Sequence, residues 1–161
     1  IMNFHPESKV WVYQSDRFFS DQEMEYLHSL LSDFTKGWTA HQQQLKAGYA
    51  IEHRLFIVLI VDESMAGASG CSIDKSVHLM KQIEGELGLN LFDRFRTAWR
   101  KQDEIQISDR NQLETLLDSG EVNGKTTVFN NLIKTYQEFQ ESWETPLENS
   151  WQARVFNVAT N

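Results

Sequence analysis

Cysteine is almost absent from this chain of 161 residues, where Cys71 stands alone. A single cysteine excludes an intramolecular disulfide, so the fold must be held by its core and needs no oxidising compartment. Proline occurs only twice, and the eight glycines form no Pro/Gly-rich linker. We therefore expect one domain over residues 1–161.

Basic residues are also scarce, with 15 Lys and Arg against 23 Asp and Glu and a net charge of −8. The electrostatic field of this net negative charge repels nucleic-acid phosphates and anionic lipid, so neither is an expected partner. The longest apolar run, Leu55–Val61, falls far short of the roughly 20 residues of a membrane helix. No basic segment followed by an apolar one opens the sequence. We expect a cytoplasmic protein without a membrane span.

Hydrophobic residues make up 40% of the chain and aromatic residues 12%, which suffices for a packed core. Alternation and β-branched runs predict strands, while helical spacing and capping residues predict helices. Over the first hundred residues we expect strands at 10–14, 45–52, 55–61 and from about 92, and helices at 21–33 and 72–87. The run at 55–61 does not alternate, which is typical of a central strand covered on both faces.

The order strand, helix, strand, strand, helix, strand is that of the split β-α-β unit in ferredoxin-like folds. We therefore predict an α+β protein with a ferredoxin-like core over about 10–100 and a C-terminal extension over about 101–161. In the extension we expect strands at 105–107, 126–129 and 151–158, and helices at 109–117 and 133–143.

Two segments look like parts of a nucleotide site. Asp62-Glu63 after an apolar strand matches a Walker B element, and 120–126 is similar to a phosphate loop. However, a phosphate loop must run from a strand into a helix, whereas here the order is helix then strand. A nucleotide hydrolase is therefore the least favoured interpretation.

The small residues around Cys71 form the most distinctive segment, Ser69-Gly70-Cys71-Ser72-Ile73-Asp74-Lys75-Ser76. A helix starting near Ser72 would point free N–H groups at whatever precedes it, and its dipole would favour a thiolate at Cys71. Lys75 adds positive charge and Asp74 opposes it. Three interpretations stay open: a packing cysteine, a ligand-contacting loop, and a reactive thiol.

His41 is the histidine best placed to act with Cys71, because it lies just before a predicted strand. A Cys–His pair needs contact at about 3 Å, which a sequence does not show. The paired amides Asn130 and Asn131, at the end of a late strand, either orient a ligand or stabilise a turn. No two histidines have metal-ligand spacing, so we expect no metal and no cofactor.

Several segments together resemble a small family of uncharacterised bacterial (Bacteroidetes) proteins, some of which carry the label "ABC transporter ATPase". The resemblance rests on Val10–Arg17, Trp38–His41, Ser69–Ser76, Val128–Leu132 and Ser150-Trp151. It covers nearly the whole chain. It implies a bacterial, cytoplasmic protein and carries over no catalytic residue.

We predict a binding or interaction module for a small polar ligand or a protein partner. Its expected site is the loop–helix junction with its neighbours: Ser69, Gly70, Ser72, Asp74, Lys75, Asn130 and Asn131. The alternative is an enzyme with Cys71 as nucleophile or redox thiol and His41 as base. The sharpest expectation is one continuous helix over 72–87, starting where the 55–61 strand ends, with Asp62 and Glu63 at the rim of a small concavity.

Overall fold

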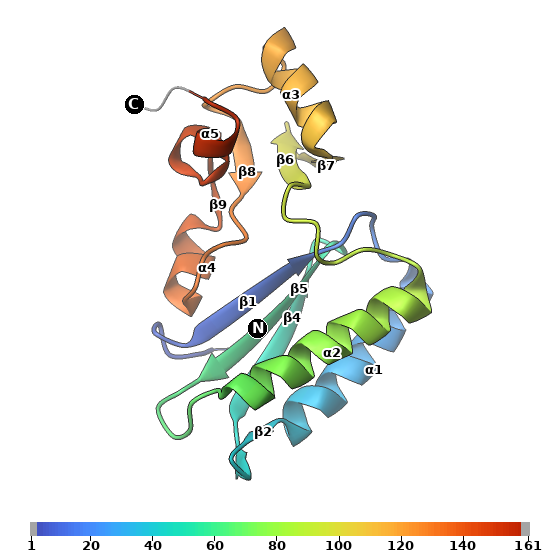
Figure 1. Cartoon of the computed structure of the whole chain (residues 1–161), viewed down its shortest axis with the longest axis vertical. Coiled ribbons are helices and arrows are strands. Elements are labelled where there is room, and N and C mark those ends of the chain that lie inside the picture. The colour runs from blue at the N-terminus through green and yellow to red at the C-terminus, as the bar shows by residue number, and fades with distance from the viewer. Residues whose placement is uncertain (1–2, 159–161) are drawn as a thin grey trace.

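The computed structural model describes residues 3–158, and its N-terminal half is a three-stranded antiparallel sheet in the order β1-β5-β4. Its strands are β1 (Lys9–Gln14), β4 (Lys46–Glu52) and β5 (Phe56–Asp62). Helices α1 (Asp21–Gly37) and α2 (Gly70–Leu87) lie side by side across one face (Figure 1). The short strands β2 (Thr39–Ala40) and β3 (Gln43–Gln44) form a hairpin after α1. All seven residues of β5 are buried, as expected for a central strand.

The C-terminal half is built on a second antiparallel sheet, in the order β7-β6-β8-β9. Its strands are β6 (Thr97–Lys101), β7 (Glu104–Ser108), β8 (Thr127–Phe129) and β9 (Glu144–Pro146). The helices are α3 (Arg110–Ser119), α4 (Tyr136–Ser142) and α5 (Gln152–Val155), with a 3-10 turn, η1 (Leu147–Asn149). This half stands over the sheet face opposite α1 and α2 (Figure 1).

An aromatic core joins the two halves. Phe56 packs with Phe129 and Trp143 at ring-centroid distances of 4.9 and 4.8 Å. Val58 and Ile60 from the same face of β5 are also fully buried in this cluster. The sheet is therefore covered on both faces, which explains why β5 is apolar without alternation.

The predicted α+β class is confirmed, but the fourth strand of the ferredoxin-like core is not where it was expected. Such a core would pair that strand with the outer edge of β1, whereas β6 pairs with β7 and β8. The tight turn at Gln102, with φ of 59°, makes β7 the nearest partner for β6. The two halves accordingly meet between α2 and β6, earlier than the expected boundary near residue 100, and the outer edge of β1 is left largely unpaired.

Other element boundaries also differ from the expectations. Residues 151–158, predicted as an edge strand, form a turn and α5 instead. The strand expected from about residue 92 begins only at Thr97, and the helix expected over 133–143 is confined to α4, Tyr136–Ser142. The cap of α3 is Asp109, whose carboxylate accepts the backbone N–H of Gln112.

A capping box at the start of α1 belongs to a larger network. The Ser20 hydroxyl accepts the backbone N–H of Glu23, and the Glu23 carboxylate accepts that of Ser20. Both carboxylate oxygens of Glu23 also accept N–H groups of Arg17 at 2.7 Å. Arg17 in turn donates to the carbonyl of Leu87 at the end of α2. One carboxylate thus ties the start of α1 to the end of α2.

Glu23→Gln should therefore destabilise the protein in a pH-dependent way. The hydrogen bonds from Arg17, followed by the Ser20 N–H, lower the pKa of Glu23 from 4.5 to about 2. A lowered pKa stabilises the fold above pH 4.5, and this stabilisation is lost as pH falls towards 2. At neutral pH we expect a loss of about 1–2 kcal/mol, at the lower end for charged hydrogen bonds because Arg17 is water-exposed. Urea denaturation at several pH values measures it.

Asp21→Asn is the matched control, because Asp21 lies in the same helical turn and pairs with Arg54 at 93% exposure of its side chain. Its cost should stay below about 1 kcal/mol. A Glu23→Gln loss that did not shrink between pH 4.5 and 2 would contradict the proposed role of the carboxylate.

Candidate functional site

The segment around Cys71 forms a well-capped helix start. The helix predicted over 72–87 is confirmed as α2, which begins two residues earlier at Gly70. Ser69 is its cap, and its hydroxyl accepts the N–H of Ser72. The Ser72 hydroxyl accepts the N–H of Ser69 and donates to its carbonyl, and Ser72 is only 1% exposed. Ser72 is therefore committed to the cap, whereas Cys71 is exposed on the first turn.

Asp62 and Glu63, expected at the rim of a concavity, instead stabilise the loop before α2. Asp62 accepts the N–H of Ser64, which together with Lys46 lowers the pKa of its carboxyl group. Glu63 accepts the N–H of Ala68 at 2.8 Å. Both carboxylates thus hold backbone rather than facing an open space.

His41 lies in the β2–β3 turn with a φ of 50° and is exposed. The indole N–H of Trp38 donates to the carbonyl of Ser72 at 2.8 Å, which places this hairpin beside the start of α2. Among residues 3–158, however, no hydrogen bond joins His41 to Cys71. Neither residue lines the cavity beside Trp99 or the hollows along β1 that are described below.

The two asparagines lie far along the chain from the α2 start, and their side chains bind other parts of the protein itself. Asn130 accepts the N–H of Leu132 through its side chain. Asn131 donates to the side chain of Gln14 and accepts the indole N–H of Trp143, both at 2.9 Å. Asn131 therefore connects β1 to the C-terminal half, and only its remaining surface faces a cavity.

The phosphate-loop lookalike at 120–126 has its side chains engaged within the C-terminal half. The side chain of Asn123 accepts the N–H of Lys125, and the Lys125 ammonium pairs with Glu148 at 2.7 Å. The segment connects α3 to β8, so no helix N-terminus follows it.

Metal sites and membrane-spanning helices were both expected to be absent. Within residues 3–158, no group of three or more His, Cys, Asp and Glu side chains is arranged to hold a metal ion. In the same range, no helix has both the length and the apolar character needed to cross a bilayer.

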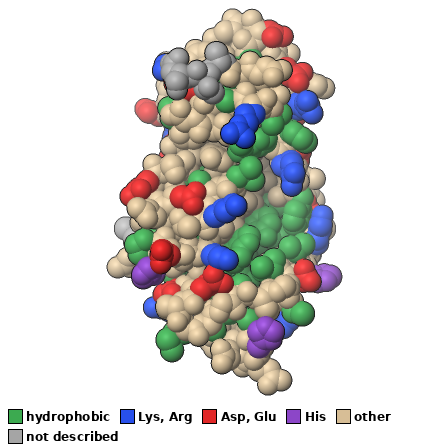
Figure 2. Space-filling view, turned by 60° about the vertical axis from the view of Figure 1, so that its left-hand side comes forward, with side chains coloured by type: hydrophobic (Ala, Val, Ile, Leu, Met, Phe, Trp, Pro, Cys, Tyr) green, Lys and Arg blue, Asp and Glu red, His purple; other side chains and the backbone are tan. Residues whose placement is uncertain are grey.

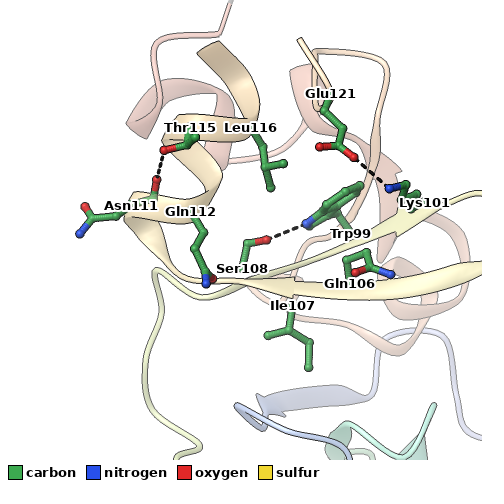
Figure 3. A pocket seen from close by; sticks show the side chains of 10 residues that line it. All are labelled: Trp99, Lys101, Gln106, Ile107, Ser108, Asn111, Gln112, Thr115, Leu116 and Glu121. Atoms are coloured by element: carbon green, nitrogen blue, oxygen red, sulfur yellow. Dashed lines mark hydrogen bonds and ion pairs between the residues drawn. The ribbon is translucent and has the colours of Figure 1, made fainter. Parts of the chain in front are cut away.

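One open cavity of about 560 Å³ lies between α3 and the β6–β7 hairpin (Figure 3). The Trp99 indole N–H donates to the Ser108 hydroxyl at 2.9 Å, and Lys101 pairs with Glu121 at the rim. Ile107 points away from the cavity, towards the N-terminal half (Figure 3). Because the strongest polar groups here already bind one another, few are left to orient a ligand.

A longer depression follows the outer edge of β1 and is called the β1 groove below. It consists of two hollows of about 610 and 200 Å³, which share Val12, Tyr13, Arg94, Asn131 and Leu132. The larger hollow is lined in addition by Lys9, Val10, Trp11, Ile73, Ile133 and Lys134. The smaller hollow extends past Gln14 towards Phe92, Arg96 and Trp151. Its walls come from β1, α2, the α2–β6 connection and the β8–α4 connection.

The β1 groove is apolar along its length and basic at its rim. Leu132 is 57% exposed there and Phe92 37%. Of the eleven residues that line the larger hollow, three are basic and none is acidic. Lys9 pairs with Glu63 at 3.4 Å, whereas Arg94 and Lys134 have no ion-pair partner among the described residues. Figure 2 shows a hollowed band of hydrophobic side chains on this side of the molecule, with Lys and Arg along it.

Polar groups in the smaller hollow are incompletely paired. The guanidinium of Arg96 contacts Asp93 at 3.4 Å, but its buried Nε has no hydrogen-bond partner within residues 3–158. Gln152, which is 2% exposed, has a buried Oε1 without a partner in the same part of the chain. Unpaired buried polar groups are uncommon in native proteins, which sets this hollow apart from the cavity beside Trp99.

Comparison with known proteins suggests no function for this chain. No protein-family model, curated protein or solved structure matches this chain. The candidate sites are therefore the cavity beside Trp99, the β1 groove and the start of α2.

The β1 groove was not predicted from the sequence. Arg94, Arg96 and Arg100 form a short basic stripe in the sequence, but Lys9 and Lys134 belong to no pattern. Lys9 precedes Arg94 by 85 residues and Arg94 precedes Lys134 by 40, and these cations come together along the outer edge of β1 only in the folded chain. The sequence predicts a fourth strand that would cover the outer edge of β1. Because β6 pairs with β7 and β8 instead, this edge is exposed.

Proposed function

We propose that this protein is a binding module whose site is the β1 groove, and that its ligand is anionic and partly apolar. The single observation that carries the proposal is the composition of the larger hollow: apolar side chains, of which Leu132 is 57% exposed, with three cations and no acid, in a chain of net charge −8. Such a cationic hollow would attract an anion despite the overall charge, because charge close to a ligand outweighs the screened charge of distant surfaces.

The location of the groove supports the same proposal. Ligand sites are found preferentially at interfaces between structural units, and this groove is lined by residues of both halves of the protein. The alternative site at the α2 start offers a capped helix and an exposed thiol, but its serine hydroxyls and neighbouring carboxylates are engaged. The ferredoxin-like relationship of β1, β4 and β5 supports this assignment, because the edge reserved for a fourth strand forms the floor of the groove.

The fluorescent anion anilinonaphthalene sulfonate is a suitable first probe, because it combines an aromatic body with a negative charge. Arg94→Glu should weaken its binding about tenfold, which corresponds to about 1.4 kcal/mol. Lys75→Glu is the matched control, since Lys75 is also exposed, has no ion pair among the described residues and changes the net charge equally. It should leave the affinity unchanged within about twofold.

The two variants also separate the proposed site from the one predicted at the α2 start. If Lys75→Glu weakened the probe and Arg94→Glu did not, the site would lie at Ser69–Lys75 and the present proposal would be wrong. Equal effects of both variants would indicate non-specific attraction and would likewise contradict it.

A further inference from the structure

We infer that the occupant of the β1 groove is an extended acidic peptide segment that adds to the free edge of β1 as a further strand. This inference rests on the proposed function and names its ligand class. An unpaired strand edge presents backbone donors and acceptors in a row, and a peptide satisfies them by strand addition.

The hydrogen bonds of β1 show which backbone groups face outward. Val10 donates its N–H to the carbonyl of Lys134, on the side away from β5, and Ser15 donates to Leu55 on the β5 side. Because N–H and C=O groups of a strand alternate between its two edges, the groups of Val12 and Gln14 also face outward. Neither residue has a backbone partner on that edge among residues 3–158. Two successive rungs of the ladder are therefore open.

The protein itself shows how a strand would enter. Residues Lys134–Tyr136 pair with the start of β1, where Tyr136 donates to Ser8 and Lys9 bridges to Thr135 in antiparallel fashion. Beyond this bridge the chain turns away at Asn130, whose side chain accepts the N–H of Leu132. The outer edge of β1 is thus covered at Ser8–Val10 and again at Asp16, whose N–H donates to the carbonyl of Asn90 at 3.2 Å. Between these points the outward backbone groups of Val12 and Gln14 have no backbone partner among the described residues.

Side chains on both sides of this edge would give the peptide its specificity. Successive side chains of an added strand point to opposite faces, so some would meet Tyr13 and Ile73, and others Leu132. Arg94 and Lys134 at the rim favour acidic residues at the remaining positions. A second copy of this chain paired through β1 would instead bring the same cations together, which disfavours a homodimer at this edge.

The probe for this inference is an acetylated and amidated peptide of about seven residues that alternates glutamate and valine, with a lysine–valine peptide as the charge control. The measurement is amide hydrogen exchange by NMR on the wild-type protein. Saturation with the acidic peptide should slow exchange of the Val12 N–H at least tenfold, to about the protection of a ladder hydrogen bond. The Trp11 N–H, which faces β5, should change less than twofold, and the lysine–valine peptide should bind at least tenfold more weakly.

Val12→Pro gives an independent test, because proline removes the outward N–H without removing a bond to β5. It should weaken the acidic peptide at least tenfold while anilinonaphthalene sulfonate still binds. Val12→Ala keeps the N–H and should retain peptide binding within about threefold. Thermal denaturation shows whether each variant is folded. If Val12→Pro does not fold, the exchange measurement on the wild-type protein still tests the inference.

The outcomes separate this inference from the proposed function. If the peptide binds and Arg94→Glu weakens it, but the Val12 N–H exchanges as before, strand addition is wrong and the groove is still a binding site. If only the sulfonate probe binds, the peptide class is wrong. If neither probe binds, both proposals fail. A wild-type dimer that Val12→Pro dissociates in sedimentation velocity would assign the edge to a second copy and overturn the inference.

Discussion

Replacing Phe56 with alanine is expected to lower the free energy of unfolding by about 3–5 kcal/mol, the usual cost of removing a buried aromatic ring. Phe56 is fully buried in β5, and its ring lies between Phe129 and Trp143 of the C-terminal half. The substitution leaves a cavity in the cluster of side chains through which β5 packs against the C-terminal half. Stability should fall for the whole protein, because neither sheet can cover its inner face alone.

Urea denaturation followed by far-ultraviolet circular dichroism and by tryptophan fluorescence measures this effect. The two signals should change together in Phe56→Ala, as in the wild type. Phe18→Ala is the control, since Phe18 is 45% exposed and its loss should cost about 0.5 kcal/mol or less. Two separate transitions would contradict the prediction, because they would mean that the two halves unfold independently.

Trp38→Ala is expected to have a comparable effect, about 3–5 kcal/mol, at the opposite side of the N-terminal sheet. Trp38 ends α1, is 2% exposed, and packs against Phe34 and Trp11 at ring-centroid distances of 4.9 and 6.2 Å. Its indole N–H also donates to the carbonyl of Ser72 in the first turn of α2. The variant therefore loses both packing and the bond that connects the end of α1 to the start of α2.

Trp38→Phe separates these two contributions. It keeps most of the ring volume but removes the indole donor, so a loss of about 1–2 kcal/mol is expected. Amide hydrogen exchange in the first turn of α2 should also accelerate, because that turn loses its tertiary contact. Equal stability of Trp38→Phe and the wild type would show that the hydrogen bond contributes nothing measurable.

The structure shows that the thiol of Cys71 is exposed. It lies on the first turn of a capped helix, beside the β2–β3 hairpin that Trp38 holds in place. The histidine expected to activate it belongs to that hairpin but makes no hydrogen bond to it among the described residues. The structure places this hairpin beside the start of α2 through the Trp38–Ser72 hydrogen bond, and a catalytic pair of Cys71 and His41 stays a prediction.

Non-glycine residues with positive φ show how tertiary contacts shape turns that the sequence only locates. His53 and Arg54 lie in the tight connection between β4 and β5, and both adopt φ values near 55°. The ring of His53 stacks on Trp143, and Arg54 pairs with Asp21 at 2.6 Å. These contacts offset the strain of the left-handed backbone, which costs a non-glycine residue of order 1 kcal/mol.

Features that depend on neighbours along the chain can be predicted from the sequence. The start of α1, the end of α2 and the burial of β5 follow from spacing and composition over fewer than twenty residues, whereas α1 runs four residues further than predicted and α2 begins two residues earlier. The α+β class follows from the order of these elements.

Which strands share a sheet depends on tertiary contacts and could not be predicted from the sequence. The alternation near Arg96 predicts a strand equally well beside β1 or beside β7, because side-chain period says nothing of the partner. The short turn at Gln102 favours β7, so β6 joins the second sheet and the edge of β1 stays open. Lys9, Arg94 and Lys134 meet along that edge only because three distant segments are packed around it, which no local pattern encodes.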